Sequence, residues 1–186
     1  MREINLKKKP KELLTVSPKG TVPVLLLSNE EVIAEIDHYY NEVGATGFSF
    51  ADNTINGSDS EYLKFLKLLV KWQDKNEPVF WSCQYALKRK KQQPEELFDY
   101  LSQANGRLSI GFDHVSDVIL THMKKLYVWD DIKHFLTQSK KYNVPITVAN
   151  WIVGYPTETQ KDFMEYKKLI NFLKENGSTI ITQSTL

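Results

Sequence analysis

Short apolar segments recur along the chain at intervals of roughly thirty to forty residues, and each is bounded by turn-forming or polar residues. The predicted strands are Val22–Leu27, Gly47–Ala51, Pro78–Cys83, Arg107–Phe112, Pro145–Gly154 and Ser178–Gln183. Amphipathic helical patterns lie between them. Strand–helix alternation of this kind builds a parallel sheet, so the pattern predicts an α/β fold.

The intervening segments carry apolar residues at three- and four-residue spacing, which indicates helices that cover a sheet. The clearest stripes are Tyr62, Phe65, Leu66, Leu69 and Trp72, then Ile132, Phe135, Leu136 and Tyr142, then Phe163, Tyr166, Ile170 and Leu173. A further helix is expected within 92–106, with Pro94 in its first turn and Gly106 at its end.

The stretch from Leu25 to Gly44 fits two structures. In a β-hairpin, "SNEE" is the turn and Val32–Glu35 is a strand, but "SNEE" lacks the glycine that a tight turn prefers. In a helix, Ser28 and Glu31 form a capping box and Gly44 ends the last turn. We therefore predict a helix from about Asn29 to Val43, which makes Val22–Leu27 the first strand.

The 186 residues suffice for one well-cored domain with a short appendage. Lys and Arg total 24 against 23 for Asp and Glu, so neither nucleic acid nor a membrane surface is expected as a partner. The N-terminus lacks the apolar core of a signal peptide, which favours a cytoplasmic location. A single cysteine excludes an internal disulfide within this sequence.

Polar residues follow the apolar part of five predicted strands. They are Asp52 and Asn53, Ser82 and Gln84, Asp113 and His114, Asn150, and Gln183. Because the carboxyl ends of parallel strands meet at one edge of a sheet, these side chains are expected to converge. A ligand site is predicted at that edge.

These positions also have structural interpretations. Asp52 could cap the turn after its strand. Asp113 could cap the next helix, where Ser116 is the better N-cap. In "GYPTET", 154–159, Gly and Pro turn the chain and a Thr caps the following helix. Cys83 is expected to be a small buried hydrophobe.

Residues 1–35 resemble the thioredoxin-like N-terminal domain of glutathione transferases. The stretch "EINLKKKPKELLTVSPKGTVPVLLLSNEEVIAE" carries the resemblance, with Pro23 where that family has its cis-proline. It implies Val22, Pro23 and Glu35 as glutathione contacts. The serine that follows the glutamate in that family is replaced by Ile36.

Residues 36–186 resemble the core of a radical S-adenosylmethionine enzyme. The stretches that carry this resemblance are "FSFADNTING", "VFWSCQYAL", "LSIGFDHVSDVILTHMKKLYVWDDIKHFL" and "ITVANWIVGYPTETQKDF". In that family, six βα units form an open barrel with ligands at the carboxyl ends of the strands. The implied fold is an open, partial (βα)6 TIM-like barrel over 22–186, its first strand supplied by the glutathione-transferase-like segment. Residues 1–21 form an appendage.

The same resemblance implies the cofactor contacts. Asp52 and Asn53 would lie near the methionine amino group, and Asp113 and His114 near the ribose or carboxylate. The segment from Asn150 to Gly154 would approach the adenine. Ser82 and Gln84 are further strand-end candidates for contacts with S-adenosylmethionine, and no catalytic residue or metal ligand is assigned.

The family's reaction needs a four-iron, four-sulfur cluster held by a CxxxCxxC loop after the first strand. The corresponding residues are "SNEE", and the one cysteine, Cys83, lies on a predicted strand. The cluster ligands are absent here, so we expect an incomplete or chimeric core without radical catalysis that retains at most weak binding of S-adenosylmethionine or a nucleotide.

Two alternatives stay open. The chain could be a non-catalytic recombination product or fragment. It could also be a glutathione- or thiol-binding module of thioredoxin type, which requires Val32–Glu35 as a strand. An open barrel also leaves an exposed strand edge, which predicts self-association.

Overall fold

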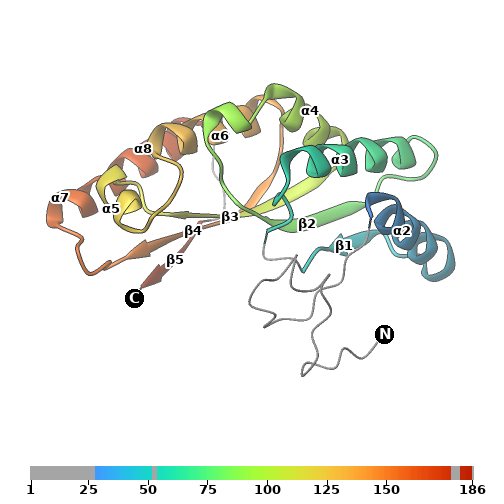
Figure 1. The fold of residues 1–186 in the computed structure, drawn as a ribbon, viewed down its shortest axis with the longest axis horizontal. Coiled ribbons are helices and arrows are strands. Elements are labelled where there is room, and N and C mark those ends of the chain that lie inside the picture. Colours follow the sequence, from blue (N-terminus) through green and yellow to red (C-terminus); the bar gives the residue numbers. More distant parts are fainter. Residues whose placement is uncertain (1–27, 52–53, 177–180, 186) are drawn as a thin grey trace, which may run out of the picture.

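The computed structural model describes residues 28–51, 54–176 and 181–185 (Figure 1). Five parallel strands form one sheet in the order β1-β2-β3-β4-β5. They are β1 (Gly47–Ser49), β2 (Phe80–Tyr85), β3 (Gly106–Asp113), β4 (Ile146–Val153) and β5 (Ile181–Thr185). Five of the six predicted strands are confirmed. The predicted first strand, Val22–Leu27, lies outside the described residues.

The helices lie over one face of this sheet (Figure 1). They are α2 (Asn29–Val43), α3 (Asp59–Gln73), the short 3₁₀ helix η1 (Lys90–Gln92), α4 (Glu95–Gln103), α5 (Asp117–His122), α6 (Trp129–Lys141), α7 (Gln160–Met164) and α8 (Tyr166–Asn176). Because the strand order follows the chain and parallel crossovers are right-handed, successive crossovers fall on the same side. This is the predicted open, barrel-like arrangement of βα units.

None of the helices in the described ranges is long and apolar enough to cross a membrane. The longest of them, α2 and α3, have 15 residues each, whereas a bilayer requires about 20.

The disputed segment is a helix with the predicted bounds. The Glu31 N–H donates to Ser28 Oγ at 3.2 Å, and the Ser28 N–H donates to the Glu31 carboxylate at 2.7 Å. Gly44 ends α2 with a φ of 72°, in the left-handed region. The hairpin interpretation is wrong because Val32–Glu35 lies inside the helix. The alternative of a thioredoxin-type module required a strand at these residues, so it is wrong as well.

The core lies between the sheet and the helices. Alternate residues of β2 and β3 point into it, and all of them are buried: Trp81, Cys83, Tyr85, Leu108, Ile110 and Phe112. Burial raises the pKa of the Cys83 thiol to about 12. Cys83 is therefore the buried small residue that its position predicts, and its thiol stays protonated at neutral pH.

Gly106 has a different role from the predicted helix stop. Helix α4 ends at Gln103, and Asn105, with a φ of 56°, turns the chain before β3. Gly106 is the first residue of β3, and a Cβ there would lie 2.6 Å from the Trp81 ring. The Trp81 indole, which donates to the Ala104 carbonyl at 2.7 Å, needs this glycine for its close approach.

Candidate functional site

The face of the sheet opposite the helices is called the open face below. Side chains alternate along a strand, so the residues between the core positions of β2 and β3 point to it. These are Phe80, Ser82, Gln84, Arg107, Ser109 and Gly111, and all of them are exposed or half-buried. Two predicted site residues, Ser82 and Gln84, therefore lie on this face.

Asn150 of β4 joins them near the carboxyl ends of the strands. It pairs with Gly111 in the parallel register, which places it on the same face, and it is exposed. A Cβ at Gly111 would have no neighbour closer than Asp113 Oδ1, at 3.9 Å. On the other side of β3, Gln84 of β2 pairs with Ser109. The C-terminal half of the open face therefore offers two amides around a surface that Gly111 leaves bare.

Asp113 stands at the end of β3. It has a φ of 55°, and the pairing with β4 shifts in register between Gly111 and Asp113. Its carboxylate lies 2.6 Å from Lys125 Nζ and accepts a hydrogen bond from the Tyr127 hydroxyl. Burial, with the neighbouring carboxylate, raises the pKa of Tyr127, so the phenol remains a donor. These contacts hold the partly buried Asp113 carboxylate at the edge where a ligand site was predicted.

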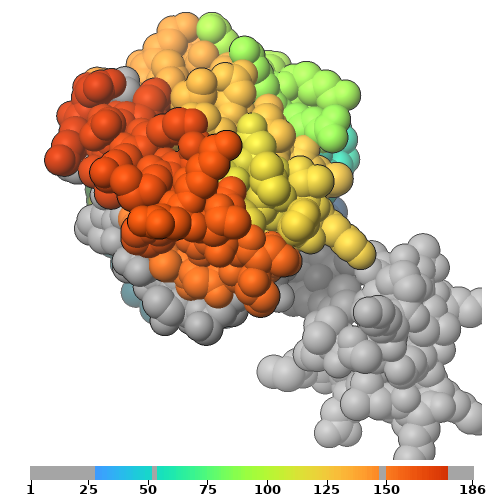
Figure 2. Space-filling model, turned by 90° about the vertical axis from the view of Figure 1, so that its left-hand side faces the viewer, coloured from blue at the N-terminus to red at the C-terminus, as the bar shows by residue number. Residues whose placement is uncertain are grey.

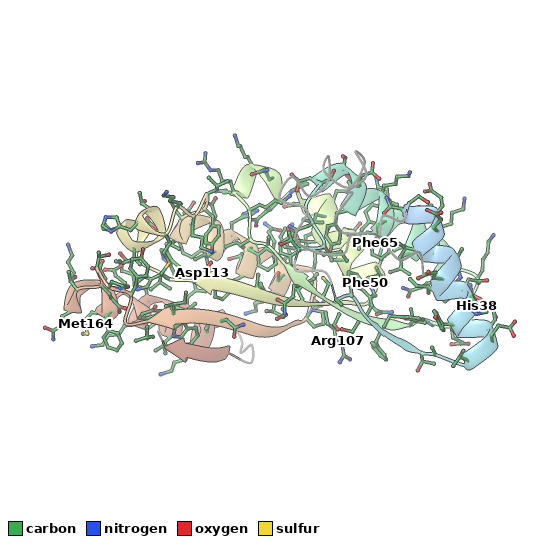
Figure 3. All side chains as sticks on the ribbon, turned by 60° about the horizontal axis from the view of Figure 1, so that its bottom comes forward. His38, Phe50, Phe65, Arg107, Asp113 and Met164 are labelled. Carbon is green, nitrogen blue, oxygen red and sulfur yellow. The ribbon has the colours of Figure 1, made fainter. Side chains whose placement is uncertain are left out.

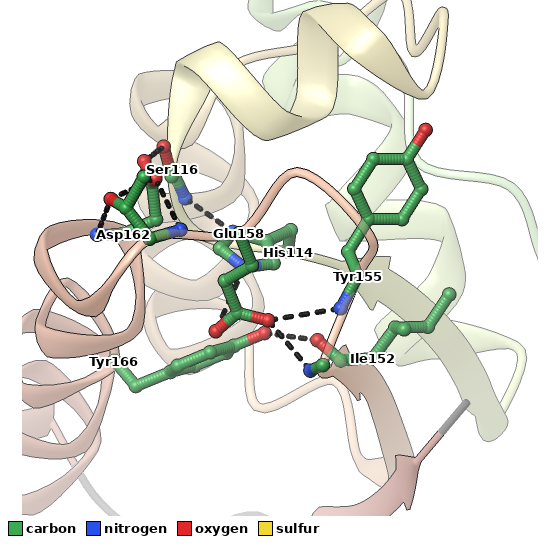
Figure 4. Close-up of polar contacts among 9 residues, drawn as sticks. His114, Ser116, Ile152, Tyr155, Glu158, Asp162 and Tyr166 are labelled. Carbon is green, nitrogen blue, oxygen red and sulfur yellow. Dashed lines mark hydrogen bonds and ion pairs between the residues drawn. The ribbon is translucent and has the colours of Figure 1, made fainter.

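His114 is fully buried, and its ring lies beside Glu158 and Tyr166 (Figure 4). Its Nδ1 accepts a hydrogen bond from the Ser116 N–H at 2.8 Å. The proton of the neutral ring therefore lies on Nε2, which is 3.8 Å from Glu158 Oε1. Neither of these two atoms has a hydrogen-bond partner within the described residues. Burial lowers the pKa of His114, so the ring is neutral at physiological pH.

Glu158 closes the loop that follows β4. Its Oε2 accepts hydrogen bonds from the N–H groups of Gly154, at 2.6 Å, and Tyr155, at 3.1 Å (Figure 4). Gly154 has a φ of 85°, which favours glycine. Tyr166 packs on His114 with ring centroids 4.9 Å apart and donates to the Ile152 carbonyl. His114 thus packs beside Glu158, which holds the loop at Gly154, and it does not line the open face.

A second carboxylate ties α5 to α7. The Ser116 hydroxyl donates to Asp162 at 2.6 Å, and Thr159 caps α7 through Asp162. The hydrogen bond from Ser116, followed by those from Thr159, lowers the pKa of Asp162 to about 2. Figure 2 shows this end of the molecule, where the yellow segment of α5 packs beside the orange and red segments of α7 and α8. Thr159 is confirmed as a cap, whereas Ser116 bonds across to α7 without capping its own helix.

The structure does not test four of the predicted site residues, and it places a fifth in a helix. Asp52, Asn53, Val22 and Pro23 lie outside the described residues. Glu35 is exposed on α2, within a helix.

The residues present do not fit a cysteine-bound cluster. "SNEE" forms the cap and first turn of α2, and the single cysteine, Cys83, is buried on the helix-covered side of β2. Among residues 28–51, 54–176 and 181–185, no three His, Cys, Asp or Glu side chains gather where they could hold a metal ion.

Arg107, Ser109 and Gly111 of the open face, and the hydrogen bonds accepted by Glu158, were not predicted from the sequence. The first three alternate with Leu108 and Ile110 inside a predicted strand, so period-two counting would have found them. Glu158 gave no signal of its own, because its partners are backbone groups of a loop whose shape the sequence does not state.

Residues 10–170 match the model of the radical SAM superfamily. A ribosomal protein uS12 methylthiotransferase from Hydrogenobaculum is 34% identical over 86 residues, which cover 44% of this chain and 21% of that protein. A tRNA-2-methylthio-N(6)-dimethylallyladenosine synthase from Lawsonia intracellularis is 34% identical over 80 residues, covering 42% and 18% respectively. The matches thus span about a fifth of the length of these curated relatives.

Solved structures share the fold at low sequence identity. The radical S-adenosylmethionine methyltransferase TsrM from Kitasatospora setae, with cobalamin and a [4Fe-4S] cluster bound, superimposes with a TM-score of 0.70 at 15% identity, over 84% of this chain and 28% of that one. Coproporphyrinogen III oxidase from Escherichia coli gives 0.56 at 13% identity, over 87% and 39%. The family match runs through residues 10–35, so the resemblance of that segment to glutathione transferases gains no support.

Proposed function

Since the chain belongs to the radical SAM superfamily, we propose that the C-terminal half of its open face binds S-adenosylmethionine. We further propose that the chain is an incomplete core of methylthiotransferase type, which does not cleave that cofactor by itself. The observation that carries the first proposal is the set of polar groups at the ends of β2, β3 and β4 around the bare surface at Gly111.

The roles of the residues follow from their chemistry. The Asp113 carboxylate, held by Lys125 and Tyr127, is an acceptor suited to the ribose hydroxyls. The amides of Gln84 and Asn150 can donate and accept, which suits a base edge or the amino acid end of the cofactor. Bound S-adenosylmethionine carries a methyl and an adenosyl group on its sulfonium, and this chain by itself would hold both in place.

His114 and the Gly154 loop take supporting parts in this proposal. The buried ring packs behind Glu158, and Glu158 holds the N–H groups of Gly154 and Tyr155. We therefore assign His114 as a positioning residue that shapes the end of β4 for the adenine, in place of the direct contact expected from the sequence.

The proposed lack of radical catalysis rests on the cysteine count. A radical SAM cluster needs three thiolates, and the sequence contains only Cys83. Anaerobic reconstitution with iron and sulfide should leave no stoichiometric cluster absorption, and addition of dithionite should release no 5′-deoxyadenosine. A stoichiometric cluster with cofactor cleavage would overturn this part of the proposal.

Binding itself is tested by calorimetric titration with S-adenosylmethionine. Gly111→Leu places a side chain on the proposed surface and should weaken binding at least tenfold. Gly47→Leu is the matched control, because Gly47 lies at the other end of the same face and its Cβ would also meet nothing nearer than 3.9 Å. Equal affinity of the two variants, or no heat at millimolar cofactor with the unsubstituted chain, would refute the proposal.

No observation favours glutathione binding or a recombined origin. The family match covers residues 10–170 and so includes the predicted junction between residues 35 and 36, and Glu35 belongs to α2.

A further inference from the structure

A polar row crosses the other end of the open face. Ser49 pairs with Ser82, and Ser82 pairs with Arg107, so three adjacent strands present these residues side by side. Neighbouring strands are about 4.8 Å apart. The row is therefore about 10 Å long, and it joins two hydroxyl groups to one guanidinium.

Arg107 has no anionic partner within the described residues. It is exposed, and its guanidinium lies 4.7 Å from the centroid of the Phe80 ring. Figure 3 shows it on the side of the sheet away from Phe65, which packs in the core. By contrast, Lys125 pairs with Asp113, the last residue of β3. A guanidinium that lies over an aromatic ring, with no carboxylate paired to it among the described residues, can bind an anion through its N–H groups.

The surface beside Arg107 is hollowed into a shallow, open pocket. Its volume is about 470 Å³, and it is lined by Gly47, Phe48, Ser49, Phe80, Trp81, Ser82 and Arg107. Gly47 adds no side chain to it. The Ser82 hydroxyl donates to Ser49 Oγ across 3.4 Å, which leaves the Ser49 hydrogen to donate to a third group. The pocket combines a fixed charge, neighbouring donors and an apolar wall.

We propose that this pocket binds an oxyanion, a phosphate or a carboxylate, carried by the substrate. Arg107 matches such a group with two parallel N–H donors. The hydroxyl of Ser82, its neighbour in the row, would turn from Ser49 to donate to the anion. Arg107 and Gly111 are four positions apart along β3, a span of about 13 Å. A substrate anchored here by its anionic end would extend along the open face toward the proposed cofactor surface. The assignment to substrate rests on the proposed function, whereas the anion site does not.

Titration of the whole ¹⁵N-labelled chain with sodium phosphate, and separately with sodium acetate, tests the site without the cofactor. Saturable shifts are expected for the amides of Gly47, Ser49 and Ser82. Arg107→Gln should weaken binding at least tenfold. Arg107→Lys, which keeps the charge but loses the paired donors, should weaken it severalfold. Lys91→Gln removes one exposed charge elsewhere and should change the affinity less than twofold.

Saturation by phosphate alone identifies a phosphate-bearing substrate, and saturation by acetate as well extends the class to carboxylates. The proposal is overturned if neither anion saturates, or if Lys91→Gln weakens binding as much as Arg107→Gln. Ser82→Ala gives a second variant that keeps the guanidinium, with an expected loss of a few fold. The result is separable from the cofactor proposal, because Gly111→Leu should leave phosphate binding unchanged.

Discussion

The two faces of β3 differ although they belong to one strand. Leu108, Ile110 and Phe112 are fully buried beneath the helices, whereas Arg107 and Gly111 are exposed on the open face. The buried residues pack against other residues of the core, whereas the exposed ones leave surface that a ligand can contact. The difference separates the residues that hold the fold from those that remain available for a ligand.

The largest expected difference between the faces is in stability. Phe112→Ala should lower the free energy of unfolding by about 3–5 kcal/mol, because it removes a buried ring and leaves a cavity. Gly111→Ala, one residue away on the open face, should change it by less than about 1 kcal/mol. Urea denaturation measures both, and similar losses would contradict the assignment of faces.

Glu158 lies in the loop after β4, near the carboxyl ends of the strands. Its substitution is expected to affect both stability and ligand binding. Glu158→Ala should cost about 2–3 kcal/mol, because two N–H groups lose a charged acceptor and His114 loses its neighbour. Glu158→Gln keeps an acceptor and should cost less. The alanine variant should also weaken S-adenosylmethionine binding beyond what Phe112→Ala does. If calorimetry shows equal effects for these two variants, Glu158 has only a structural role.

A pair of glycines sharpens the comparison further. Gly106→Ala should destabilise the chain by about 1–3 kcal/mol, because its Cβ would overlap the Trp81 ring on the covered face. A Cβ at Gly47 would contact only the Phe80 carbonyl oxygen, at 3.9 Å, so Gly47→Ala should be nearly neutral. Thermal unfolding followed by circular dichroism compares them, and an equal drop in Tm would show that Trp81 can move aside.

The smallest expected effect is the pH dependence that comes from His114. Its pKa is lowered in the folded state from an ordinary value of 6.5. As the pH falls through that value, His114 binds a proton in the unfolded chain but not in the folded chain. The stability that the neutral, buried ring contributes is therefore lost on acidification. His114→Asn should flatten the decline between pH 7 and pH 5, while His122→Asn, at an exposed site, should not. Unfolding curves across this range provide the measurement.

Prediction from the sequence succeeded where local signals agreed. The bounds of α2 followed from Ser28, Glu31 and Gly44, which act on the backbone within their own helix. Strands β1 to β5 followed from short apolar runs. Gly106 was misassigned because its reason, the Trp81 ring, lies on another strand. His114 was wrongly predicted at the ligand edge. Its side chain lies beside Glu158, in a loop far along the chain, and no local signal indicates that contact.

The sequence by itself determined the alternation of strands and helices, the cap of α2 and the lack of three cysteines for a cluster, because each depends on residue type and local spacing. Only the tertiary structure decided which polar residues share a surface. Parallel register set Ser49, Ser82 and Arg107 in one row, and the loop after β4 enclosed His114. Such groupings depend on strand pairing between residues far apart in the chain, which no local pattern encodes.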